Sequence, residues 1–199
     1  MINIPPPMTS DLSEEDAMVL DTIGKWLDRD VRPHVLRLDH ADEYPGEIVE
    51  QMKELGLFGA TIPVQYGGLG LSASTYVRVI EKISEVWMSL AGIINSHLIM
   101  AACVTRNGTE EQQRFLPLFS SGVVRGGLAL TEPDAGTDLQ AIRTHAIRDG
   151  DHYVINGAKT WISNGIKGSC FALLVKTDLQ ADPRHKGMSM FIAEKGEGF

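Results

Sequence analysis

Apolar residues recur at helical spacing through residues 1–125 of the chain. Ser13 is followed three positions later by Asp16, which resembles a capping box, and an apolar stripe then continues toward Pro33. The stripe consists of Ala17, Leu20, Ile23, Trp26 and Leu27. This pattern predicts an amphipathic first helix that Pro33 disturbs.

Two further helices are predicted in the same way. Pro45 opens the second helix, and Gly56 is placed to end it. The apolar stripe of this helix consists of Ile48, Met52 and Leu55. Ser72 can cap a third helix, which we expect to run to about Met88.

The segment "SLAGIINSHLIMAACVTRNG" predicts a fourth helix that ends at Gly108. Because this segment is nearly all apolar, we expect the helix to be buried on most sides. Thr109 and Gln112 form a capping box for a short fifth helix, which Pro117 bends or ends. Residues 1–125 are therefore predicted to form an all-α helical domain.

From Gly126 onward the pattern changes to apolar strands separated by tight turns. The predicted strands lie in "GGLALT", "RTHAIRDGDHYVINGAKTWISNG", "CFALLVKT" and "MSMFIAE". Hairpin signals stand at Asp149-Gly150, Asn156-Gly157 and Asn164-Gly165, because these residue types tolerate positive φ. Residues 126–199 are therefore predicted to form an antiparallel β domain, which makes the fold α+β. The sequence ends just after a strand, so we expect further chain to cover the open edge.

Composition and charge narrow the function classes. Of 199 residues, 43% are hydrophobic, and 18 Lys+Arg against 26 Asp+Glu give a net charge of -8. Such a charge repels a phosphate backbone, so no nucleic-acid partner is expected. Cys103 and Cys170 lack metal-ligand spacing, so we expect no metal site and interpret both as buried thiols of a reduced compartment. The start "MINIPPPMTSD" has no targeting pattern and no membrane-length apolar run occurs, which predicts a cytoplasmic protein without membrane contact.

Three other features have plain structural explanations. The glycine-rich stretch 66–70 lacks the GxGxxG spacing of a dinucleotide loop, and we expect a flexible loop between helices. His97, within the fourth helix, is expected to be a hydrogen-bonded core histidine rather than a catalytic base. Glu81 and Glu85, beside Lys82, indicate a solvated helix face.

The segment "TEPDAGTDLQ", residues 131–140, holds more hydroxyl, carboxylate and small residues than a turn requires. Together with "KTWISNG", residues 159–165, it closely resembles the flavin-binding signature of acyl-CoA dehydrogenases, TEPxAG[ST]D followed by a hairpin and KxWI[ST]NG. The resemblance includes "GLFGATIPVQYGGLGLS" and the order of five helices, and it covers the chain from about Asp11 to Phe199.

The resemblance implies an N-terminal helical domain, a middle β-barrel and a C-terminal four-helix domain, with FAD between the last two. This chain holds the first domain, residues 1–125, and an incomplete barrel, residues 126–199, while the four-helix domain is absent. The implied reaction removes a proton from the α-carbon of an acyl-CoA, and a hydride passes from the β-carbon to flavin N5. The product is the trans-2-enoyl-CoA, and electrons pass on to an electron-transferring flavoprotein.

The resemblance also implies flavin contacts. The backbone of Leu128, Ala129 and Leu130, with the Thr131 hydroxyl, matches the strand at the flavin's pyrimidine edge. The small residues Ala135 and Gly136 would let the backbone approach the FAD pyrophosphate. Thr137 matches a family Ser that bonds the phosphate and lies beside the thioester substrate.

The second motif supplies the remaining contacts in Trp161, Ile162 and Ser163. Trp161 matches an aromatic residue packed on the isoalloxazine, and Ser163 matches a hydroxyl residue at flavin N5. The structural alternatives are a Trp buried in the core and, for Thr131, a threonine that ends a strand.

The catalytic base in this family is a Glu of the C-terminal bundle, so we expect no catalytic residue within these 199 residues and no activity from them alone. A homodimer or homotetramer is implied for the complete enzyme. Two alternatives remain: a flavin oxidase or hydroxylase of the same fold that uses oxygen, and a catalytically silent binding module. No residue pattern assigns the length or branching of the acyl group.

Overall fold

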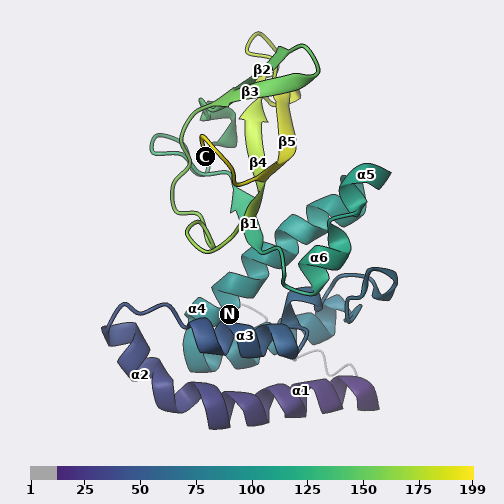
Figure 1. The fold of residues 1–199 in the computed structure, drawn as a ribbon, viewed down its shortest axis with the longest axis vertical. Helices are drawn as coiled ribbons and strands as arrows, with labels where there is room; N and C mark the ends of the chain where they lie inside the picture. The colour runs from purple at the N-terminus through teal and green to yellow at the C-terminus, as the bar shows by residue number, and fades with distance from the viewer. Residues whose placement is uncertain (1–12) are drawn as a thin grey trace, which may run out of the picture.

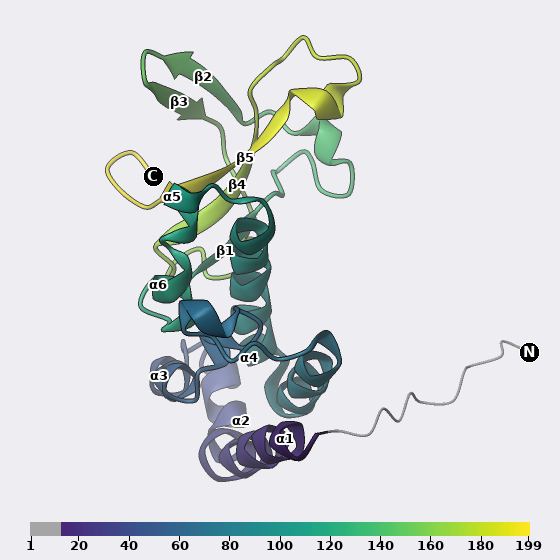
Figure 2. The ribbon, with the colours of Figure 1, turned by 90° about the vertical axis from the view of Figure 1, so that its right-hand side faces the viewer.

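The computed structural model describes residues 13–199 as a helical part followed by a β-sheet (Figure 1). The segment "MINIPPPMTSD", in which the sequence analysis found no targeting pattern, lies outside the described residues. The helices are α1 (Glu14–Trp26), α2 (Arg32–His40), α3 (Gly46–Glu54), α4 (Ala73–Asn107), α5 (Glu110–Gln113) and α6 (Leu116–Ser120). The strands are β1 (Gly126–Ala129), β2 (His145–Asp149), β3 (His152–Asn156), β4 (Cys170–Lys176) and β5 (Met188–Glu194). The sheet stands at one end of the helical part, and α4 extends to it (Figure 2).

Proline begins helices in this chain where the sequence pattern indicated an end. The Ser13 hydroxyl accepts the Asp16 N–H at 3.0 Å and starts α1, as predicted. A π-helical turn, Leu27–Val31, follows α1, and Pro33 then lies in the first turn of α2. Pro117 has the same place in α6. A helix tolerates proline there because the first N–H groups have no partner within the helix.

The predicted second and fifth helices begin where expected. Pro45 precedes α3, and Gly56 follows it with a φ of 72°, which glycine adopts at little cost. The capping box of Thr109 and Gln112 is formed in both directions at the start of α5.

α4 contains both the third and the fourth predicted helices. Ser72 caps it by accepting the Thr75 N–H, as expected. Trp87 has φ −158° and ψ 104°, which breaks the helix one residue before the predicted boundary at Met88. The largely buried Trp87 indole donates a hydrogen bond to Asp39 Oδ1 of α2 at 3.2 Å. The two predicted helices are thus two halves of one element joined at a fixed break.

Within residues 13–199, α4 is the one helix that is long and apolar enough to cross a membrane by length and composition. A core helix meets the same criterion, and α4 contributes to two core clusters. Val79, Ile83 and Leu90 pack with α1, α2 and α3, whereas Leu98 and Met100 pack with α6 and β4. The expected burial of the fourth predicted helix on most sides is incomplete, since Ile99 within it is 41% exposed.

The sheet is mixed, so the prediction of an antiparallel domain is wrong. β1 and β4 run parallel, with Gly126 opposite Cys170, and β2 meets β4 in parallel where His145 faces Lys176. Only the pairs β2–β3 and β4–β5 are antiparallel. Within the described residues this sheet is open rather than closed into a barrel. The segment between β1 and β2 does not reverse the chain direction, so β1, β2 and β4 all run the same way. Alternating apolar positions carry no information on strand direction.

Of the three predicted hairpins, only Asp149-Gly150 joins two strands, β2 and β3. Asn156-Gly157 ends β3, and Asn164-Gly165 forms a turn in an irregular segment. Cys170 is buried, which raises its thiol pKa to about 12, but Cys103 is only partly buried. The prediction of buried thiols therefore holds fully for Cys170 alone.

Candidate functional site

The fold brings the two sequence motifs side by side at the end of β1. The Thr160 N–H donates to the Thr131 carbonyl at 2.9 Å. Farther along, Gly127 lies against the second motif, because a Cβ atom on it would stand 2.9 Å from the Ser163 carbonyl oxygen. Residues 131–137 and 159–163 thus form one continuous surface region.

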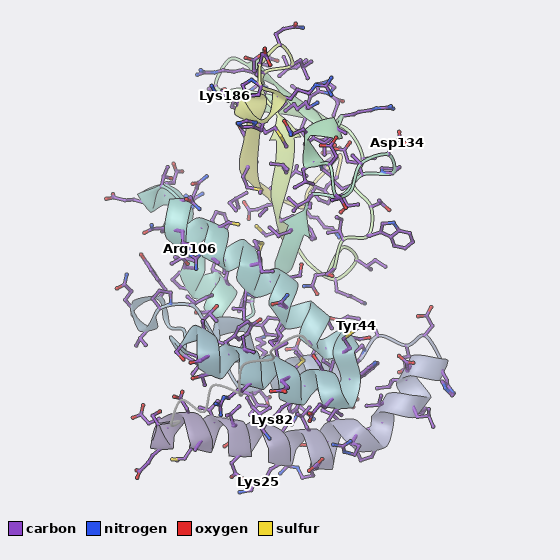
Figure 3. All side chains as sticks on the ribbon, turned by 180° about the vertical axis from the view of Figure 1, so that it is seen from behind. Lys25, Tyr44, Lys82, Arg106, Asp134 and Lys186 are labelled. Carbon is purple, nitrogen blue, oxygen red and sulfur yellow. The ribbon has the colours of Figure 1, made fainter. Side chains whose placement is uncertain are left out.

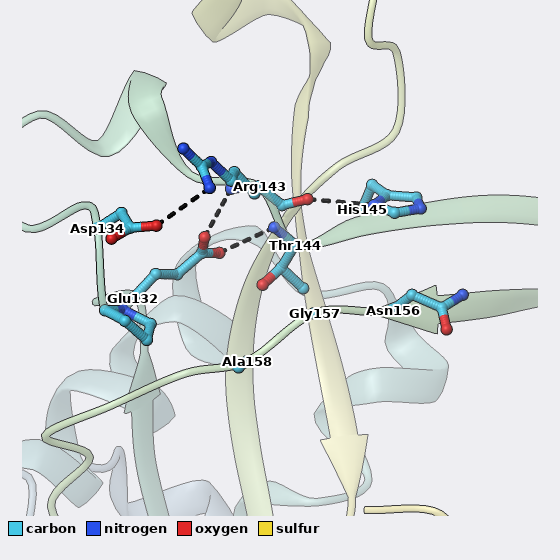
Figure 4. Close-up of a pocket in the computed structure, with 9 residues that line it drawn as sticks. Glu132, Asp134, Arg143, Thr144, His145, Asn156, Gly157 and Ala158 are labelled. Carbon is cyan, nitrogen blue, oxygen red and sulfur yellow. Dashed lines mark hydrogen bonds and ion pairs between the residues drawn. The ribbon is translucent and has the colours of Figure 1, made fainter.

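A buried ion pair that the sequence reasoning missed joins the motifs. Lys159 Nζ lies 2.8 Å from Glu132 Oε1 and also donates to the Leu130 carbonyl at 2.9 Å. The Glu132 carboxylate further accepts the N–H groups of Arg143 at 2.6 Å and Thr144 at 3.0 Å (Figure 4). The Glu132 and Lys159 side chains are only 5% and 9% exposed. No spacing rule links two residues this far apart, so the periodicity of the sequence carried no signal for the pair.

Electrostatics keep Glu132 ionised. Burial raises its pKa, but the hydrogen bonds from Lys159, Thr144 and Arg143 outweigh this effect and lower the pKa to about 2. Burial lowers the pKa of Lys159, an effect that Glu132 opposes. Glu132 therefore acts as a structural anion that closes the turn, not as a proton acceptor at neutral pH.

Trp161 lies at the surface instead of in a core. Its side chain is 90% exposed, and its φ of 57° is a costly conformation for a bulky residue. The core alternative for Trp161 is therefore wrong. A large exposed aromatic residue in a strained backbone conformation is typical of a binding surface.

The hydroxyl groups of this surface are available to a ligand. Thr137 and Ser163 are exposed and Thr131 is partly buried, and none of the three hydroxyls has a hydrogen bond within residues 13–199. A Cβ atom on Gly136 would meet nothing within 4 Å, so the backbone there is open to close approach. Asp134 lies beside the sheet, away from the helical part (Figure 3), and pairs with Arg143 at 3.1 Å (Figure 4).

Other predicted residues build the framework. The Leu128 N–H donates to Ser96 Oγ at 3.4 Å. The Ala129 side chain is buried, and Ile162 packs on the core of the sheet. The Leu130 carbonyl is taken by Lys159. Ala135 is buried and exchanges backbone hydrogen bonds with Glu132, so it shapes the turn. It was expected to face a ligand, and it does not.

A cavity of about 570 Å³ opens beside Ser163 at the break in α4. Its walls come from both halves of α4 and from the second motif. The lining includes Ser84, Met88, Ser89, Gly92, Asn95 and Asn164. The cavity thus adjoins the exposed surface of the two motifs.

His97 is the core histidine that the sequence predicted. It is fully buried, and burial lowers its pKa to about 4. Nε2 of the neutral ring lies 3.1 Å from the Phe119 carbonyl oxygen, and Nδ1 accepts the Gly126 N–H at 3.4 Å. Since a carbonyl only accepts, Nε2 carries the proton. His97 therefore joins α4, α6 and β1.

The prediction of a solvated helix face at Glu81 and Glu85 is confirmed, whereas backbone hydrogen bonds hold the loop 66–70, which was expected to be flexible. In the loop 66–70, the N–H groups of Leu69 and Gly70 bond the carbonyls of Gly59 and Ile62, so they are not free for a phosphate. Glu81 and Glu85 are exposed. In the part of the chain that the structure describes, no cluster of three or more His, Cys, Asp or Glu could hold a metal ion.

Comparison with known families covers almost the whole described chain. Residues 13–123 match the N-terminal domain of acyl-CoA dehydrogenases, and residues 127–199 match their middle domain. A (2S)-methylsuccinyl-CoA dehydrogenase of Cereibacter sphaeroides is 38% identical over 95% of this chain and 35% of its own length. The mitochondrial isovaleryl-CoA dehydrogenase of Pongo abelii is 38% identical over 93% of this chain and 45% of its own.

Solved structures agree with these relatives. A glutaryl-CoA dehydrogenase from Mycobacterium smegmatis, in complex with FADH2, superposes with a TM-score of 0.82 at 25% identity. The match covers 92% of this chain and 46% of that one. The chain thus spans about half the length of the proteins it matches, or less.

Proposed function

The chain belongs to the acyl-CoA dehydrogenase family. We propose that the surface formed by residues 131–137 and 159–163 is half of an FAD site for dehydrogenation of an acyl-CoA thioester. FAD is the cofactor of this family, as the complex with FADH2 illustrates. The observation that carries the proposal is Trp161, 90% exposed and held at a φ of 57° beside free hydroxyls.

The residues present fit a flavin. Trp161 offers a flat apolar surface on which an aromatic ring system can pack. Ser163 and Thr131 offer unengaged hydroxyls, and such donors stabilise negative charge on a ring edge. The open backbone at Gly136, with the Thr137 hydroxyl beside it, suits a pyrophosphate. Bound FAD would supply the hydride acceptor.

We propose that the cavity at the break in α4 receives the acyl group. It adjoins Ser163, so a group bound in it would lie beside the proposed flavin surface. The lining combines Met88 and Gly92 with the small polar residues Ser84 and Ser89, and about 570 Å³ suits a short or branched acyl chain. The two named relatives act on branched acyl-CoA thioesters by their names, which supports the same substrate class.

The remaining parts of the proposal concern residues outside this chain. Glu132 is committed to Lys159, so we propose that the base at the α-carbon comes from a C-terminal domain and that residues 1–199 alone are inactive. That domain and further strands would also close the open sheet into a barrel. The proposed partners are an electron-transferring flavoprotein and further copies in a dimer or tetramer. Free thiols at Cys103 and Cys170 support a cytoplasmic location.

The test uses a chimeric enzyme in which a relative supplies the other half of the proposed site. Residues 13–199 replace the matching half of the Pongo abelii isovaleryl-CoA dehydrogenase, and flavin reduction by isovaleryl-CoA and butyryl-CoA is followed by visible absorbance. We expect bound flavin and its reduction. Ser163→Ala should weaken flavin binding or shift its potential by an amount equivalent to about 1–3 kcal/mol, because one hydrogen bond is lost, with an unchanged melting temperature.

Ser169→Ala, an exposed serine beyond the motif, is the control and should behave like the parent chimera. A folded chimera that retains no flavin would contradict the proposal. Flavin reoxidised by oxygen in preference to an electron-transferring flavoprotein or ferricenium would favour the oxidase alternative instead.

A further inference from the structure

The side chain of Asn164 connects three parts of the proposed site. Asn164 has a φ of 64°, a left-handed conformation that asparagine tolerates better than most residues. Its Nδ2 group donates one hydrogen bond to the Ile93 carbonyl at 2.9 Å and another to the Gly126 carbonyl at 2.8 Å. Ile93 belongs to the half of α4 after the break, and Gly126 begins β1.

These contacts lie where the cofactor surface meets the cavity. Asn164 and its neighbour Ser163 both line the cavity, and so does Ile93. Gly126 begins the strand that leads into Thr131. One amide group therefore ties the cavity wall, the start of β1 and the second motif to each other.

We propose that Asn164 is a positioning residue, whose amide fixes Ser163 and Trp161 relative to the acyl cavity. The inference rests on the proposed function, since it assigns what sets the geometry of that site. A positioning residue acts through its neighbours, because it determines where the groups that contact substrate and flavin stand.

The amide is required because both partners are acceptors. A carboxylate in its place would bring negative oxygens against two carbonyl oxygens, and an apolar side chain would remove the Asn164 donor from both carbonyls. Other contacts hold the loop itself. The Gly168 N–H donates to the Asn164 carbonyl at 2.6 Å, and Lys195 Nζ donates to the Gly165 carbonyl at 2.6 Å. Lys167 Nζ also lies 5.3 Å from the centroid of the Tyr44 ring.

The loop is thus anchored independently, and loss of the amide should free its orientation without unfolding it. Asn164→Gly removes the amide side chain without adding backbone strain, because glycine adopts a φ of 64° freely. Asn164→Asp keeps the size of the side chain and reverses its hydrogen-bonding character. Asn107→Asp is the control, since the Asn107 amide also bonds a carbonyl, that of Cys103, but at the exposed end of α4.

Two measurements use the 199-residue chain. The first is amide hydrogen exchange by NMR. We expect the Gly165 and Gly168 N–H groups to exchange about 5- to 150-fold faster in Asn164→Gly, the range for loss of two hydrogen bonds, with Ile94 in the core unchanged. The second is FAD titration by NMR, in which affinity should fall about tenfold, equivalent to one or two hydrogen bonds. Asn164→Asp should show larger effects and Asn107→Asp none.

Each result has a definite meaning. Unchanged exchange at Gly165 and Gly168, or equal acceleration at Ile94, would overturn the positioning role. Faster exchange in the loop with an FAD affinity equal to that of the parent chain would also overturn it. If FAD does not bind the parent chain at all, the proposed function fails, and the exchange data still decide whether Asn164 orders the loop.

Discussion

At the scale of single residues, Trp161 separates a binding surface from a core. A buried tryptophan replaced by alanine costs about 3–5 kcal/mol of folding free energy. Because Trp161 is 90% exposed, we expect Trp161→Ala to change the free energy of unfolding by less than about 1 kcal/mol. Urea unfolding of the 199-residue chain measures this difference.

Trp26→Ala provides the comparison for Trp161→Ala. The Trp26 side chain is buried, and its indole donates to Gln51 Oε1 at 2.8 Å. This variant should lose the full cost of a core tryptophan, about 3–5 kcal/mol. Equal losses in both variants would contradict the surface assignment.

Glu132 predicts how stability responds to acid. Its pKa is about 2 in the folded protein, against an ordinary value of 4.5, so the unfolded chain takes up a proton first as the pH falls. The stabilisation is complete above about pH 4.5 and is lost as the pH falls toward 2. Glu132→Gln should lower stability at neutral pH and reduce the pH dependence in this interval, as measured by urea unfolding at a series of pH values.

Removing one member of a buried ion pair costs about 3–5 kcal/mol, so the neutral-pH effect of Glu132→Gln should be large. The control is Asp134→Asn, which breaks the exposed pair with Arg143 and should cost less than about 1 kcal/mol. A Glu132→Gln variant with the acid profile of the parent chain would show that the carboxylate is not held as described.

At the scale of elements, a contact between two helices forms at the break in α4. The Trp87 indole N–H, largely buried, has Asp39 as its acceptor. Asp39→Ala leaves this donor unpaired and should cost about 1–3 kcal/mol, whereas Asp39→Asn retains an acceptor oxygen and should cost much less. Urea unfolding compares the two variants.

Asp28→Ala serves as the control, because Asp28 forms only an exposed pair with Arg32. It should cost less than about 1 kcal/mol. If Asp39→Asn proved as destabilising as Asp39→Ala, the acceptor role of Asp39 would be wrong.

Helix starts were predictable because caps act locally. Ser13, Ser72 and Thr109 each bond an N–H group three residues away, so the sequence alone contains the whole interaction. Helices are interrupted just before Pro33 and Pro117, as the sequence indicated, but the pattern did not indicate that a new helix begins at each proline. Strand direction in the sheet depends on the route of the segment between β1 and β2, which no local pattern describes.

At the scale of the whole molecule, the candidate site was only partly predictable. The two motifs identified Trp161 and Ser163 through their residue types and their resemblance to a family. The Glu132–Lys159 ion pair and the bridge made by Asn164 join residues distant in sequence, and they exist only once β1, α4 and the loop are packed together. A reading of periodicity cannot find such contacts.

The central claim is that the surface of the two motifs binds a flavin. The direct measurement is an NMR titration of the 199-residue chain with FAD to high concentration, which detects weak binding by half a site. We expect shifts of the Trp161 indole N–H and of the backbone amides of Thr131, Thr137 and Ser163, with saturation at a common affinity. Absence of these shifts, or shifts centred on the loop 66–70 instead, would contradict the account.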